Sequence, residues 1–478
     1  MKRILMMLIF FTSLYASNET NNKKKCITIN NDKKIVYCNN EKIDHLTLNI
    51  KSNKNANIKI NTQNKSYSYN IPTIINQEQT MSLEIKINNI KSINFNNIEI
   101  KKSNIQITKT DPQKFKIFID KDGYSISFNL NKNMFPIIGF KSKKTILNPI
   151  ITNLYSKKES QKIVLSNLIK YTSLENHNDE IKSTKNDNMI QINEIGYINM
   201  NDYYEINKPI NADLKLIFNY TKKNYRRDSF EFFNFIANPN IYIIKFKTLH
   251  DQALMLKRMA FFLEKKEFRG KLLSNTELEN KIGWGGHDYR LQDIITFFNE
   301  AQKLNIKLNK EEIILKNLII ANKLAYLENN TIKIKSKSKN IAFATYSEDE
   351  IMSKTDQMRI FMHEMLHMYF FTDNNFNKAI VNFWNKHISP NNKKSWINFL
   401  DNIGYDVTFN YLVINEFYAY TTALPKENIA NYLINTNYFS KTEFKEYEKW
   451  AIKLEKLLWQ TKGLIPGELL ILFKDKIN

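Results

Sequence analysis

Residues 358–371 read MRIFMHEMLHMYFF and carry the pattern H-E-x-x-H at His363, Glu364 and His367. Apolar residues fill most of the stretch, so we predict a buried helix here. Positions i and i+4 of a helix lie on the same face, and both imidazoles can therefore reach a single ion. Glu364 then lies beside that ion without having to bind it. The pattern predicts a metal site inside a helical core.

Two histidines of one helix and a third protein ligand are typical of a catalytic Zn²⁺ site that keeps its fourth position for water. Zn²⁺ lowers the pKa of that water, and a carboxylate placed like Glu364 can take the proton as the water attacks a carbonyl carbon. The expected chemistry is hydrolysis, most often of a peptide bond. The alternative is a core helix that contains two satisfied histidines. An unpaired buried Glu or His is costly, however, and a metal removes that cost, so we favour zinc.

Three downstream residues are candidates for the third ligand. Asp373 lies where a compact zinc site places its ligand, but that arrangement needs a glycine turn and the chain has Phe370 there. His387 lies near the end of another expected helix. Glu416 belongs to the sequence NEFYAY, within a second apolar helical stretch, where the small Ala419 would let the two helices approach closely. We favour Glu416.

With these two helices the chain resembles the gluzincin zinc peptidases, in which an H-E-x-x-H helix is followed by a helix with N-E-x-x-[AS]. The resemblance covers residues 347–420 and leaves the subfamily open. It implies His363, His367 and Glu416 as ligands of Zn²⁺, with Glu364 as general base. It also implies an α+β zincin-type domain, in which the strand before the H-E-x-x-H helix forms the edge along which an extended peptide lies.

The chain departs from that family in its spacing and in the support of its ligands. Glu416 follows His367 by 49 positions, more than in thermolysin-like enzymes. Tyr420 stands where many relatives carry an aspartate that supports a histidine ligand. Three aspartates are candidates to replace it, namely Asp373, Asp401 and Asp406.

A donor that stabilises the tetrahedral intermediate must also be found, since neither histidine nor arginine follows Glu416. Tyrosine plays this part in the aminopeptidase branch of the family, and the candidates here are Tyr418, Tyr420, Tyr432 and Tyr438. We favour Tyr420 as a catalytic residue because it shares the helix face of Glu416. The G-x-M-E-N signature of that branch is absent upstream, so we do not expect a typical aminopeptidase.

Residues 283–290 read GWGGHDYR and contain three of the ten glycines of the chain. We expect a glycine-rich loop that leads into a helix, with His287, Asp288 and Arg290 at the helix start. These side chains would line the substrate cleft or contact the zinc ligands. The alternative is a tight loop whose polar groups cap the helix.

The N-terminus predicts export. Lys2 and Arg3 precede the apolar run 4–11, and we predict a signal peptide at residues 1–16. That run is too short to span a bilayer, and no later apolar stretch is long enough, so we expect no transmembrane segment in the mature chain. Two short strands on either side of a turn would pair antiparallel, with opposite residues whose numbers sum to 64. Cys26 then lies opposite Cys38. This predicts a hairpin closed by a disulfide, with free thiols as the alternative, and a periplasmic location.

The fold predicted for the whole chain is multidomain. Residues 24–150 show short alternating runs that predict an all-β, sandwich-like domain, with a clear hairpin formed by 115–120 and 124–130. The polar stretch 156–188 is expected to hold the domain boundary, and 190–478 to form the zincin-like catalytic domain.

Within the predicted catalytic domain we expect a strand at 241–246, an amphipathic helix at 251–265 and a strand at 341–346. A capping box of Ser347 and Glu350 would then begin the H-E-x-x-H helix. A second capping box, at Ser440 and Glu443, would begin a long helix that ends near Gly463.

The formal net charge of +22 would attract anionic partners such as cell-wall polymers. Lysine and asparagine are abundant throughout, however, and no basic stretch interleaves aromatic residues, so we expect no nucleic-acid partner. The sequence predicts an exported zinc peptidase that acts on peptide or protein substrates, including cell-wall peptide. The alternatives are a peptidoglycan amide hydrolase and a non-enzymatic cell-envelope adhesion or scaffold protein with a structural zinc.

Overall fold

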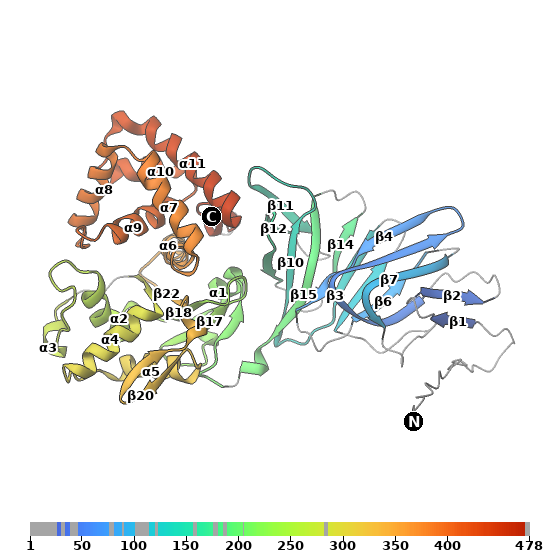
Figure 1. Ribbon diagram of the computed structural model, residues 1–478, viewed down its shortest axis with the longest axis horizontal. Helices are drawn as coiled ribbons and strands as arrows, with labels where there is room; N and C mark the ends of the chain where they lie inside the picture. The colour runs from blue at the N-terminus through green and yellow to red at the C-terminus, as the bar shows by residue number, and fades with distance from the viewer. Residues whose placement is uncertain are drawn as a thin grey trace, which may run out of the picture. The chain divides into compact units, whose positions relative to one another are not determined.

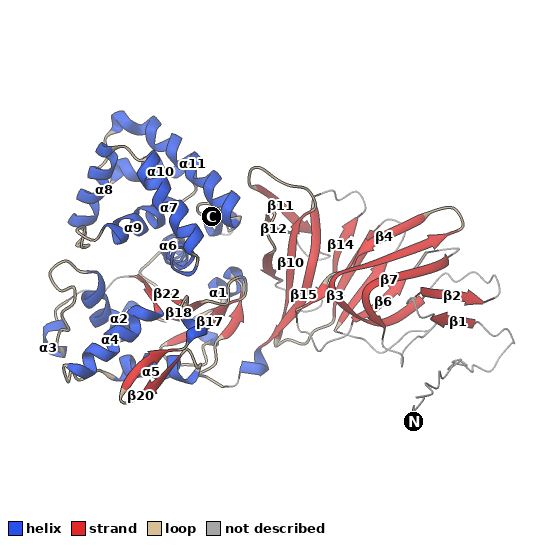
Figure 2. Cartoon of the chain, viewed as in Figure 1, coloured by secondary structure: helices blue, strands red, loops and turns tan. Residues whose placement is uncertain are grey.

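The computed structural model describes residues 26–473 with short gaps at 30–33, 39–45, 76–80, 88–89, 101–113, 120–122, 156–159, 175–179, 185–188, 204 and 282–284. The predicted signal peptide lies outside the described residues. The chain forms two compact units. Unit 1 takes residues 1–132, 155–160 and 176–197, and unit 2 takes 133–154, 161–175 and 198–478. Strands precede helices along the described chain, as predicted, since the first α-helix begins at Leu214 (Figure 2).

Unit 1 is built on a nine-stranded sheet with the order β1-β2-β7-β3-β6-β8-β9-β14, and β4 pairs with β3. Most neighbours are antiparallel, whereas β6 and β8 are parallel. The strands of this sheet are β1 (Cys26–Ile29), β2 (Lys34–Cys38), β3 (Leu46–Thr62), β4 (Ser66–Asn70), β6 (Met81–Ile85), β7 (Ile90–Ile100), β8 (Phe115–Ile119), β9 (Gly123–Phe128) and β14 (Glu180–Thr184). Outside this sheet, β5 (Thr73–Ile74) pairs in parallel with β15 (Ile190–Asn199).

Two hairpins of unit 1 have the predicted partners. β8 and β9 pair antiparallel, with Phe115 opposite Phe128. β1 and β2 pair with Cys26 opposite Cys38, which is the predicted register. The side chains of both cysteines lie outside what the structure describes, so the disulfide stays a prediction.

The polar stretch 156–188, predicted as a boundary, contains parts of both units. Unit 2 begins with strands that lie before and within this stretch and then continues into a mixed α and β part. Its first elements are β10 (Met134–Ser142), β11 (Ile150–Tyr155), β12 (Ser160–Leu165), β13 (Lys170–Ser173), the short 3₁₀ helices Met200–Tyr203 and Lys222–Asn224, and α1 (Leu214–Asn219).

The part of unit 2 that carries the H-E-x-x-H helix has a five-stranded sheet with the order β16-β17-β18-β22-β19. β22 runs parallel to β18 and antiparallel to β19. Its strands are β16 (Ile210–Ala212), β17 (Phe230–Phe235), β18 (Ile241–Phe246), β19 (Gly286–Arg290) and β22 (Ala342–Ser347), and β20 (Ala325–Glu328) pairs with β21 (Thr331–Ile334). The strands predicted at 241–246 and 341–346 are therefore confirmed.

Different helices cover the two faces of this sheet. Phe343 of β22 and Tyr289 of β19 pack into a core with residues of α2 (Leu249–Glu264), α4 (Leu291–Lys303) and α5 (Lys310–Ala321). Side chains alternate along a strand, so Ala344 and Tyr346 lie on the other face, where Tyr346 stacks on Phe361 of α6 (Lys354–Thr372) with ring centroids 4.3 Å apart. Small alanines on that face let α6 lie close to the sheet.

Further helices lie on the far side of α6 from the sheet (Figure 1). They are α7 (Asn374–His387), α8 (Pro390–Asn402), α9 (Asn410–Thr422), α10 (Lys426–Asn435) and α11 (Phe444–Lys462). The short α12 (Glu468–Leu472) also contacts α6, while α3 (Asn275–Leu278) lies between α2 and β19 in the chain. α11 ends at Gly463, as predicted, with this glycine in the left-handed conformation at φ 60°. Within the described residues, no helix has the length and apolar composition needed to cross a membrane.

The predicted starts of two helices are wrong. α6 begins after Ser353, whose hydroxyl accepts a hydrogen bond from the Asp356 amide at 3.1 Å, whereas Ser347 still belongs to β22. The residues between them form a turn before the helix. At the second site, Ser440 caps a short 3₁₀ turn, Lys441–Glu443, and α11 follows it.

The glycine-rich segment also differs from its prediction. Residues 286–290 form strand β19, and α4 begins only at Leu291. β19 is the last strand of the sheet, so β22 has a partner on each side and is not the edge strand expected from the resemblance. The local reason is the alternation of His287 and Tyr289, which are both buried on one face.

Candidate metal centre

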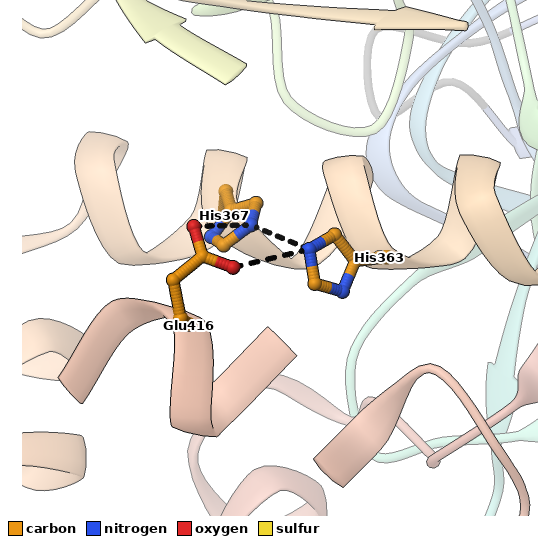
Figure 3. Close-up of side chains that lie close together, drawn as sticks. All are labelled: His363, His367 and Glu416. Carbon is orange, nitrogen blue, oxygen red and sulfur yellow. Dashed lines mark hydrogen bonds and ion pairs between the residues drawn. The ribbon is translucent and has the colours of Figure 1, made fainter. Parts of the chain in front are cut away.

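Three side chains from two helices converge at one point. α6 presents His363 and His367 one turn apart, and α9 presents Glu416 opposite them (Figure 3). The two Nε2 atoms are 3.1 Å apart. The Glu416 carboxylate lies 3.4 Å from the Nε2 of His363 and 3.7 Å from that of His367. The structure thus brings together the ligands that the resemblance implies.

This arrangement fits a cation better than it fits a cluster of protein groups alone. Donor atoms that bind one Zn²⁺ tetrahedrally at about 2.0–2.1 Å lie roughly 3.4 Å from one another, close to the three separations here. Two neutral imidazole nitrogens that face each other share at most one proton. Within the described structure, Oε2 of Glu416 makes no hydrogen bond although the residue is only 1% exposed. Buried polar atoms of native proteins rarely lack a partner, and an ion would supply one.

Burial sets the protonation of these three side chains. It lowers the pKa of His363 to about 3, helped by the positive charge of Arg359. It lowers the pKa of His367 to about 4, although the Glu416 carboxylate opposes this shift. Both rings are therefore neutral at neutral pH, which is the form in which imidazole binds a metal. Burial raises the pKa of Glu416, and His367 opposes that rise.

Glu364 lies beside these candidate ligands, next to Gly286, the first residue of β19. A side-chain Cβ at Gly286 would come within 2.2 Å of Oε1 of Glu364, so only glycine leaves room for this carboxylate. Oε2 of Glu364 has no hydrogen-bond partner in the described structure, and the residue is 6% exposed. Burial, followed by repulsion from Glu416 and Glu264, raises the pKa of Glu364 well above its ordinary value. These are properties of a group suited to take up a proton.

Asp288 supports His367 from the sheet. Its Oδ2 lies 3.7 Å from Nδ1 of His367, the ring nitrogen that points away from Glu416. The Asn415 amide donates a hydrogen bond to the same oxygen at 3.4 Å. Asp288, Glu364 and His367 have ligand atoms within 4.8 Å of one another, so this group too could hold a cation. Burial raises the pKa of Asp288 well above its usual value, and the Glu364 carboxylate raises it further.

His363 is held by α9 rather than by an acidic side chain. The backbone of Ala419 interacts with its ring and raises its pKa against the effect of burial. The ring of Tyr420 lies 4.4 Å from the His363 ring, centroid to centroid, at an interplanar angle of 67°. Burial raises the pKa of Tyr420 well above its ordinary value, so its hydroxyl remains a donor. At His363 a backbone group and an aromatic ring thus stand where the resemblance implies a supporting aspartate.

The other residues considered as the third ligand interact with different parts of the fold. Asp373 joins α6 to α7, accepts hydrogen bonds from the amides of Asn375 and Phe376, and pairs with Lys462. His387 is the last residue of α7 and packs against Phe383. The two other aspartates considered as histidine supports form ion pairs with basic residues, Asp401 with Lys266 and Asp406 with Arg269.

The three candidates in the glycine-rich segment are separated by strand alternation. Asp288 reaches the metal centre. His287 lies on the opposite face, where its Nδ1 is 3.1 Å from the hydroxyl of Tyr289 and burial lowers its pKa to about 3. Arg290 lies on the Asp288 face one pleat further on, with its guanidinium 5.9 Å from the ring centre of Phe371.

Sequence reasoning missed the roles of Gly286 and Asn415. The NE pair that identified Glu416 already contained Asn415, so a signal for it was present. No local signal identified Gly286, because its role depends on the helix that lies beneath it. Comparisons of the chain with protein-family models, with curated proteins and with solved structures find no match.

Proposed function

We propose that the protein is a zinc-dependent peptidase with a zincin-type catalytic domain in unit 2. The main support is the convergence of His363, His367 and Glu416 from two helices, with a separate buried carboxylate beside them. Bound there, Zn²⁺ would supply Lewis-acid activation of a carbonyl and a water that is acidic enough to react at neutral pH. The three side chains would hold the ion and leave one side open to substrate.

The side chains around the ion would have separate roles in the reaction. Glu364 accepts a proton from the attacking water and then delivers it to the leaving amine. The Asp288 carboxylate lies 3.7 Å from Nδ1 of His367, and by accepting a hydrogen bond from that nitrogen it would fix the tautomer and the direction of the ring. Tyr420, next to His363, is our choice for the donor that stabilises the developing oxyanion.

We propose that an extended substrate adds to the outer edge of β19, in place of the edge role first assigned to β22. β19 ends the sheet, runs antiparallel to β22, and carries Gly286 and Asp288 directly against Glu364 and His367. A peptide that pairs with this strand would pass along the metal centre. Main-chain hydrogen bonds would give affinity for peptides of varied sequence.

The substitution Glu364→Gln tests the catalytic role. Glutamine keeps the size of the side chain and cannot accept the proton, so we expect zinc to remain bound while casein hydrolysis falls by roughly 10²–10⁴-fold. Zinc content by atomic absorption and cleavage of casein are the two readouts. Glu279→Gln, at an exposed glutamate, is the matched control and should behave as the parent. A Glu364→Gln protein as active as the parent would refute the assignment.

Export to the periplasm is part of this proposal and is supported by residues 1–16 and by the facing positions of Cys26 and Cys38. A periplasmic enzyme would meet cell-wall peptides as well as proteins. Parallel incubation with purified sacculi and with casein separates a peptidoglycan amide hydrolase from a general peptidase. Cleavage of neither substrate by the zinc-loaded protein would favour the scaffold alternative.

A further inference from the structure

Strand β19 runs beside helix α6, and its residues approach the helix at regular intervals. Gly286 is next to Glu364, Asp288 is next to His367, and the Arg290 guanidinium is over the ring of Phe371. Alternate strand residues therefore follow successive turns of the helix. The contact between Arg290 and Phe371 is the next one along β19 and α6, just beyond the candidate metal centre.

A cavity of about 840 Å³ opens at that contact. Its lining includes Arg290, Phe371, Tyr411, Asn377, Lys333 and Lys339. Phe371 also stacks on His367, with ring centroids 6.3 Å apart and planes at 19°, so one wall of the cavity is shared with the metal centre. A substrate group in the cavity would thus lie close to the reacting bond.

The charged residues in the described lining of the cavity are all basic. Three basic residues line the cavity, and no aspartate or glutamate is among the described residues that do so. Arg290 donates through Nε and Nη2 to Asp293 at 2.7 Å, which fixes the guanidinium, and its Nη1 makes no hydrogen bond to a described residue. Lys333 pairs with Glu328 outside the lining. Lys339 has no ion-pair partner in the part of the chain that the structure describes.

We propose that this cavity is a specificity subsite that takes a carboxylate of the peptide substrate, either an acidic side chain or the terminal carboxyl group. The inference rests on the proposed peptidase function and names its substrate class. Arg290 would hold the carboxylate through its remaining Nη1 donor, and the ammonium of Lys339, which also lines the cavity, would add positive charge. Phe371 and Tyr411, whose ring centres lie 5.9 Å and 5.7 Å from the guanidinium, keep it in place.

Peptide binding tests the subsite without relying on hydrolysis. Zinc-loaded Glu364→Gln protein is titrated against fluorescein-labelled peptides that alternate Glu with Ala, or Gln with Ala, each with a free or an amidated C-terminus. We expect roughly tenfold tighter binding of the peptide class that carries the recognised carboxylate. The Glu and Gln pair tests the side-chain source, and the free and amidated pair tests the terminal source.

Variants in the same background separate the subsite from general attraction to a basic protein. Arg290→Gln together with Lys339→Met should abolish the preference. Lys307→Met removes an exposed lysine outside the cavity lining and should leave it intact. Titration at physiological ionic strength limits long-range attraction. Equal binding of all four peptides, or a preference that survives the double substitution, would overturn the proposal. Failure of the parent to cleave casein would count against the peptidase function alone, since the binding preference is measured independently.

Discussion

Burial gives each residue of the candidate centre its chemical state. The two histidines lie in surroundings that keep them neutral, with pKa values of about 3 and about 4, while the Glu364 carboxylate is pushed toward accepting a proton. One helix thus carries two neutral imidazoles and, between them in the sequence, a carboxyl group with an increased affinity for a proton. Such opposed shifts in adjacent groups are typical of catalytic sites.

The substitution Asp288→Asn tests whether Asp288 orients the His367 ring. Asparagine is a weaker hydrogen-bond acceptor for Nδ1–H of His367 than a carboxyl group that can ionise when the metal binds, so we expect zinc affinity to fall by roughly 10–100-fold. Competition with a chromophoric chelator measures that affinity, and the visible spectrum of the Co²⁺-substituted protein reports the ligand field. Asp401→Asn, at an exposed ion pair, is the matched control. Unchanged affinity together with an unchanged Co²⁺ spectrum would remove Asp288 from this role.

The elements show which parts of the fold the sequence could predict. The helices around His363 and Glu416 and the β18 strand have clear local patterns, and they formed as predicted. β19 did not, because a five-residue strand with two inward side chains resembles a loop until its partner is known. β19 pairs with β22 so that Gly286 lies opposite Tyr346, and this register brings Asp288 next to His367. No local sequence pattern encodes that pairing. Glu416 was predicted because it has its own motif.

A buried ion pair links the helices behind the sheet. Arg258 of α2 donates through Nε to Glu312 of α5 at 2.8 Å, and their side chains are 0% and 2% exposed. The same guanidinium also contacts Asn275 of α3. Arg258→Met would leave the buried Glu312 carboxylate without its cation, although the Asn309 amide would still donate to it. We therefore expect a loss of about 3–5 kcal/mol in the free energy of unfolding.

Urea denaturation measures this loss. The double substitution Arg258→Met with Glu312→Leu removes both charges and should recover much of the lost stability. A single variant as stable as the parent, or a double variant less stable than the single one, would show that the pair does not act in this way.

Over the whole molecule, the chain places its chemistry in one of two compact units. The candidate centre, the β19 edge and the basic cavity all belong to unit 2, and the residues that build them range from Gly286 to Tyr420. The change from a strand-rich to a helical part followed from the sequence, since the spacing of its apolar residues changes. The division into units did not, because the chain passes between them several times from 132 to 198 and long-range pairing decides those passages.

The position of the metal tests the central claim most directly. Diffraction from crystals of the zinc-loaded protein, recorded on both sides of the zinc absorption edge, locates the ion by its anomalous signal. We predict a single strong peak in unit 2, about 2.0–2.2 Å from Nε2 of His363, Nε2 of His367 and a carboxylate oxygen of Glu416. A map with no peak there, or with an ion bound elsewhere while Glu416 lies beyond reach of both rings, would contradict it.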